Sequence, residues 1–171
     1  MASGRCWGFA GLNLMRLQVV DSLELNTFEF SQNYFMFWDK LEKANYFLEN
    51  IIKSRDETYE SRLITHLLKA PVQDGGQWDM FVNLINKYGA VPKDVMPETN
   101  HSSKSGAMNY ILTHKLREFA SILRKKPAKN SSILKKDMME TIYNLLAMFL
   151  GQPPDVINWS TRNKDNRHIV I

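Results

Sequence analysis

The sequence predicts a mainly α-helical fold, with a β-strand beginning only near the C-terminus. Through most of the 171 residues, apolar side chains recur three and four positions apart, which is the spacing of a buried helix face. Only VINWSTR, residues 156–162, alternates as a strand does. Because 44% of the residues are hydrophobic and 11% aromatic, we expect one domain with a proper core.

Residues 6–23 form the first predicted helix. Its apolar residues recur at helical spacing: Trp7, Ala10, Leu14 and Leu17. Gly8 and Gly11 leave bare patches on this helix, where another backbone can approach closely. We therefore expect the helix to pack tightly on a neighbouring element.

A second, longer helix is predicted after Ser31, whose side chain is placed to cap the first turn. Its apolar face is long and aromatic: Tyr34, Trp38, Leu41, Leu48 and Ile52. The polar residues 54–61 then form a loop. A short helix follows and stops before Pro71, because proline disfavours helical geometry in the residue that precedes it.

A tight turn at Gly75 and Gly76 precedes the next predicted helix, which starts at Trp78 and ends at Gly89. Residues 90–99 contain two prolines and are expected to be extended.

Two further helices are predicted over residues 103–126 and 132–150, the second ended by Gly151 and two prolines. The residues expected to point inward from the first of them are Met108, Ile111, Leu112, Leu116, Phe119 and Leu123.

Cys6 is the only cysteine in the chain, so no internal disulfide framework can form. This favours a reducing compartment, and we expect the cytoplasm because no stretch is typical of a signal peptide or a membrane span. At the first turn of a helix, unpaired N–H groups and the helix dipole stabilise a thiolate, which suits a nucleophile. The alternative from local pattern alone is a small buried apolar residue.

Several blocks of the sequence resemble one family. SGRCWGFAGLN is similar to the active-site segment of papain-like cysteine peptidases, and further blocks resemble their bleomycin hydrolase and aminopeptidase C group: FEFSQNYFMFWDKLEKANYFLE, DGGQWDMFVNLINKYGAVPKDVMPET, LTHKLREFA and LGQPPDVINWSTRNKD. The resemblance covers about residues 3–165. It implies that residues 1–171 are a single partial domain, the helical half of a papain-like α+β cysteine peptidase fold. A helical insertion would occupy about residues 103–150, and the sheet-rich part would begin over about 155–171.

The resemblance also implies roles for individual residues. Cys6 would be the nucleophile of a cysteine-type aminopeptidase that acts on peptides without a cofactor, and its backbone N–H would be one donor to the oxyanion. Trp7 would shield the thiolate from water, while Gly75 and Gly76 would line the cleft and bind the substrate backbone in strand fashion. The group assembles as homohexamers, so a homo-oligomer is expected.

Other parts of a thiol peptidase are missing from the sequence. The catalytic histidine, the orienting asparagine and the oxyanion-binding glutamine have no match, and His168 is a poor candidate because no small residue follows it. His66, His101 and His114 are expected to be surface or structural residues, and no metal site is indicated. We therefore expect a fragment that is inactive alone, with apolar faces such as the Tyr34 to Ile52 stripe exposed.

A basic segment, residues 115–136, supports a second hypothesis. It contains one acidic residue, Glu118, and eight basic residues: Lys115, Arg117, Arg124, Lys125, Lys126, Lys129, Lys135 and Lys136. Such residues are usually solvated. The alternative is a non-catalytic helical module that uses them to bind nucleic acid or another acidic partner.

Overall fold

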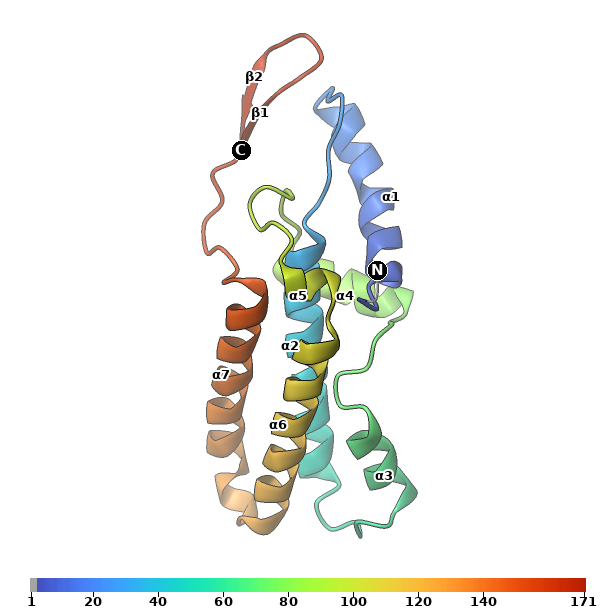
Figure 1. Ribbon diagram of the computed structural model, residues 1–171, viewed down its shortest axis with the longest axis vertical. Helices are drawn as coiled ribbons and strands as arrows, with labels where there is room; N and C mark the ends of the chain where they lie inside the picture. Colours follow the sequence, from blue (N-terminus) through green and yellow to red (C-terminus); the bar gives the residue numbers. More distant parts are fainter. Residues whose placement is uncertain (1–2) are drawn as a thin grey trace.

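The computed structural model describes residues 3–171 as a helical protein with a small β-hairpin (Figure 1). The described elements are α1 (Cys6–Ser22), α2 (Gln32–Lys53), α3 (Arg62–Lys69), α4 (Trp78–Tyr88), α5 (Asn100–Ser103), α6 (Gly106–Lys125), the 3-10 turn η1 (Ala128–Asn130), α7 (Ser131–Leu150), β1 (Ser160–Arg162) and β2 (His168–Val170). The predicted fold class, mainly α with little sheet, is confirmed.

Helix α2 is the central element, and α6 and α7 pack along it (Figure 1). It begins as predicted, since Ser31 Oγ accepts a hydrogen bond from the N–H of Tyr34 at 3.0 Å. The helix is buried on several sides, with Phe37 and Leu48 fully enclosed. The expectation of an exposed stripe is wrong: Tyr34 and Leu48 are buried, while Trp38, Leu41 and Ile52 pack partly buried against the main core.

The helix predicted over residues 103–126 starts three residues later than expected, and a short helix that was not predicted precedes it. Helix α5 ends at Ser103 and α6 begins at Gly106, because Thr99 and Ser102 form a capping box that starts a separate short helix. On α6 the predicted inward residues are buried except Ile111, which is 40% exposed. Helix α7 starts one residue earlier than predicted and ends before Gly151.

Helix α1 stands apart from the bundle and packs on α2 and α4 through its glycines. A Cβ on Gly8 would lie 2.2 Å from the ring of Phe35, and one on Gly11 would lie 2.5 Å from the ring of Phe81. The close approach predicted at these glycines therefore exists, but aromatic rings rather than backbone fill it. The face formed by Ala10, Leu14 and Leu17 is exposed, so those residues do not form the buried side of α1.

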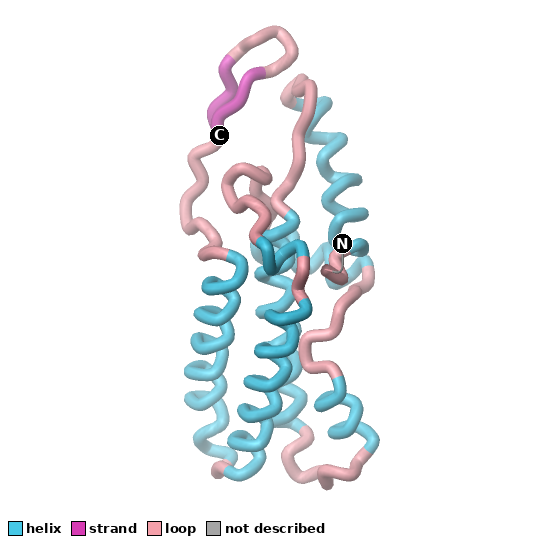
Figure 2. Tube along the Cα trace, viewed as in Figure 1, coloured by secondary structure: helices cyan, strands magenta, loops and turns pink. Residues whose placement is uncertain are grey.

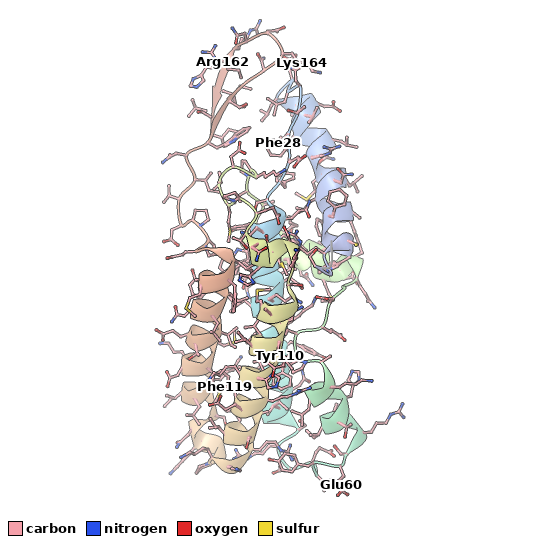
Figure 3. The ribbon with its side chains drawn as sticks, viewed as in Figure 1. Phe28, Glu60, Tyr110, Phe119, Arg162 and Lys164 are labelled. Carbon is pink, nitrogen blue, oxygen red and sulfur yellow. The ribbon has the colours of Figure 1, made fainter. Side chains whose placement is uncertain are left out.

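The C-terminal hairpin projects beyond the bundle, and Figure 2 shows it as the only strands drawn. Strand β1 pairs antiparallel with β2, with Thr161 opposite Ile169. The predicted strand is shorter than expected, and β2 was not predicted because its three residues are too few to show alternation. The hairpin is held near Phe28, whose ring meets that of Trp159 edge to face at 5.5 Å, while Arg162 and Lys164 lie at its outer end (Figure 3).

Among residues 3–171, no helix is both long enough and apolar enough to cross a membrane. The division into a helical insertion over about 103–150 and a sheet-rich start over about 155–171 stays a prediction.

Candidate active site

Cys6 is the first residue of α1, and its side chain is exposed. The chain before it is anchored, because the buried Arg5 donates from Nε to Ser3 Oγ at 3.2 Å and from a terminal nitrogen to Glu98 at 2.8 Å. The carbonyl of Arg5 accepts the first helical hydrogen bond, from the N–H of Phe9 at 2.9 Å. The thiol therefore lies at a fixed helix start, where first-turn N–H groups have no helical partner.

Trp7 joins this helix start to the Gly75–Gly76 segment. Its ring contacts Phe35 edge to face at a centroid distance of 5.1 Å. The Trp7 ring also contacts Gly76, where a Cβ would lie 2.7 Å from it. The Nζ atom of Lys43 lies 5.3 Å from the ring centroid. The structure thus brings together Cys6, Trp7, Gly75 and Gly76, the four predicted site residues.

The two glycines differ in their backbone hydrogen bonds. Gly75 has φ +86°, its N–H donates to the carbonyl of Gly4 at 3.4 Å, and its carbonyl accepts from Lys43 Nζ at 2.7 Å. Within residues 3–171, the N–H and the carbonyl of Gly76 make no hydrogen bond. Gly76 is therefore the glycine with backbone groups available to an extended peptide.

Three buried charged residues of α2 under this segment, Asp39, Lys40 and Lys43, were not singled out from the sequence, and the exposed Asp74 of the loop pairs with one of them. Lys43 pairs with Asp39 at 2.9 Å, their side chains being 9% and 8% exposed. Lys40, only 2% exposed, donates to the carbonyl of Val72 and to Asp74, both at 2.9 Å. The sequence signal was DKLEK within an aromatic helix, since charges rarely lie on a buried face without partners.

Burial sets the electrostatics of the Asp39–Lys43 pair. Removal from water raises the pKa of Asp39 and lowers the pKa of Lys43, because each loses hydration of its charged form. The attraction between the two opposes both shifts. Losing one partner alone would leave an uncompensated buried charge.

The structure brings no histidine into a hydrogen bond with Cys6 in the described part of the chain. His168 lies in the hairpin, which packs near the other end of α1, and a 17-residue helix is about 26 Å long. His66 is exposed on α3, His114 bonds the carbonyl of Tyr110 on its own helix, and His101 packs on Phe149. No group of three His, Cys, Asp or Glu side chains within residues 3–171 is arranged to hold a metal ion.

Half of the eight basic residues in segment 115–136 bind other residues of the chain. Arg117 donates to the carbonyls of Leu68 and Lys69, and Arg124 donates to those of Ser54 and Glu57. Lys115 pairs with Glu118, and Lys135 pairs with Glu49. These side chains hold loops and helices together, which leaves fewer cations for an acidic partner than the sequence count implies.

Comparison with known proteins gives consistent relatives. The chain is 55% identical over 166 residues to aminopeptidase C of Listeria innocua, covering 96% of this chain but 38% of that protein. It is 42% identical over 174 residues to bleomycin hydrolase of Oryctolagus cuniculus, covering 98% of this chain and 63% of that protein.

The crystal structure of PepW from Lactobacillus rhamnosis matches 99% of this chain with a TM-score of 0.95 and 46% identity, over 39% of the PepW chain. The chain thus spans less than two thirds of the length of each of these relatives. The model of the Peptidase C1-like family matches residues 1–170, and the chain belongs to that family.

Proposed function

We propose that this chain supplies the nucleophile-bearing, helical part of a cysteine aminopeptidase. The observation that carries the proposal is the exposed Cys6 at the start of α1, one residue from the Trp7–Gly76 contact. The names of the relatives, aminopeptidase C and bleomycin hydrolase, support the same activity.

In the proposed reaction, the Cys6 thiolate attacks the carbonyl carbon of the peptide bond. The C–N bond then breaks, the amine leaves with a proton from a general acid, and the acyl group stays on sulfur until water releases it. The first-turn N–H groups of α1 would stabilise the oxyanion, and the free backbone groups of Gly76 would align the peptide. The general acid would be a residue in the part of the enzyme that corresponds to the unmatched part of the relatives.

A chimaera tests this proposal. In it, the present chain replaces the matching segment of Listeria innocua aminopeptidase C, and hydrolysis of an aminoacyl 4-nitroanilide is followed. We expect activity in the chimaera, less than about a thousandth of it after Cys6→Ser, and negligible activity for the 171 residues alone, since a thiol lacking its base is a poor catalyst. A folded but inactive chimaera, or one still active after Cys6→Ser, overturns the proposal.

Three further features belong to this proposal. Peptides are the substrates, the cytoplasm is the compartment, and the complete enzyme is a homo-oligomer, with hexamers expected from the family resemblance. The single cysteine supports a reducing compartment. Sedimentation of the chimaera measures the oligomeric state, and a monomer at micromolar concentration contradicts that part alone.

A further inference from the structure

Two lysines on consecutive turns of α2 hold the loop that carries Gly75. Lys40 binds the carbonyl of Val72 and the carboxylate of Asp74, and Lys43 binds the carbonyl of Gly75. Three points within four residues are thus fixed to one helix. This segment has no regular secondary structure of its own, so the lysines replace the ladder bonds that would otherwise hold it.

Lys43 also reaches the other side of the site. Its ammonium group lies 5.3 Å from the centroid of the Trp7 ring, next to Cys6 in the sequence, while its carboxylate partner Asp39 lies one turn earlier on α2. One buried cation therefore contacts both segments that meet at the candidate cleft. A cation over an indole ring is attracted to it, more strongly when water is excluded.

We propose that Lys43, supported by Lys40, is a positioning residue of the peptidase: it sets the location of the Gly75–Gly76 backbone relative to Trp7 and so aligns the bound peptide. The inference rests on the proposed function and assigns to Lys43 a role that acts through Gly75 and Trp7. The carbonyl of Gly75 accepts from Lys43, and its N–H donates to the carbonyl of Gly4. These bonds hold Gly75 in place, so that the free N–H and carbonyl of the next residue, Gly76, can bind the peptide.

The test uses the active chimaera with the double substitution Asp39→Leu and Lys43→Met. This change removes both buried charges together, so no unpaired charge remains in the core. We expect KM for an aminoacyl-peptide substrate to rise about tenfold while kcat changes less than about twofold, because the lost interaction aligns the bound peptide before and during reaction. Inactivation by iodoacetamide, which needs no aligned backbone, should keep its rate within about twofold.

The matched control is Glu49→Gln with Lys135→Met, an ion pair that joins α2 to α7 and does not contact residues 72–76. It should leave KM unchanged. Lys40→Met is the second variant, since its partner Asp74 is 47% exposed and can be solvated; it should also raise KM. The inference is overturned if the double variant folds and keeps the original KM. If the double variant does not fold, an unchanged KM for Lys40→Met overturns it. An inactive unsubstituted chimaera instead contradicts the proposed function.

Discussion

The indole ring of Trp7 lies against Gly76 so closely that a Cβ at residue 76 would stand 2.7 Å from it. The ring has little room to retreat, because Phe35 packs against it edge to face and Lys43 lies over it. Trp7, the residue after Cys6, and Gly76, 69 positions later in the chain, are therefore in direct contact.

Gly76→Ala tests this contact in the chimaera. We expect kcat/KM for peptides to fall about tenfold or more, since overpacking a tight contact costs about 1–3 kcal/mol and moves the ring beside the thiol. Gly106→Ala is the control, because a Cβ there meets nothing within 4 Å. Equal kcat/KM in the two variants contradicts a tight contact at Gly76.

The pH dependence of stability should report the anchor of Arg5. Burial raises the pKa of Glu98, but hydrogen bonds from Arg5 and Ser102 outweigh it, so its pKa is lowered from the ordinary 4.5. A carboxyl with a lowered folded-state pKa stabilises the fold above its unfolded pKa and loses that effect as the pH falls through the folded value. The free energy of unfolding should therefore decrease below about pH 5.

Glu98→Gln should make this decrease shallower, as measured by urea unfolding followed by tryptophan fluorescence between about pH 3 and 7. Glu118→Gln, at a surface pair with Lys115, serves as the control and should keep the original slope. Parallel curves for Glu98→Gln and the unsubstituted chain would show that the Arg5–Glu98 pair does not contribute.

A substitution of Arg124 distinguishes two roles for the basic segment 115–136: holding the fold together and binding an acidic partner. It donates to the carbonyl of Ser54 at 2.9 Å and lies 4.4 Å from the ring centroid of Tyr59. Arg124→Met should lower the free energy of unfolding by about 1–2 kcal/mol, whereas Lys125→Met, exposed at the end of α6, should stay within about 0.5 kcal/mol. The helical binding module would be favoured instead by a different result: both substitutions change the free energy of unfolding little, and both weaken a salt-dependent binding of DNA.

Local chemistry was enough to predict where helices start and stop. Ser31 caps α2 as predicted, and Gly89 and Gly151 follow α4 and α7, because caps depend on residues within one turn. The exception is α5, where Thr99 and Ser102 cap each other in a polar stretch, residues 99–105, that has no apolar spacing to indicate a helix.

The covered face of each helix was decided by tertiary structure. Apolar spacing predicted Leu14 and Leu17 on the apolar side of α1, yet α1 packs through Gly8 and Gly11, where the rings of Phe35 and Phe81 fit. Periodicity shows which residues share a side of a helix, but not which side another element reaches. The same reason explains why the Tyr34 to Ile52 stripe is packed rather than exposed.

The sequence by itself determined the family, the helical class and the neighbourhood of Cys6, Trp7, Gly75 and Gly76, because these residues lie in blocks that resemble peptidases of known type. Only the tertiary structure placed Lys40 and Lys43 under the Gly75 loop. Their partners, Val72, Asp74 and Gly75, lie more than thirty positions away. A buried lysine is tolerated where folding brings it acceptors, and no local pattern states which acceptors those are.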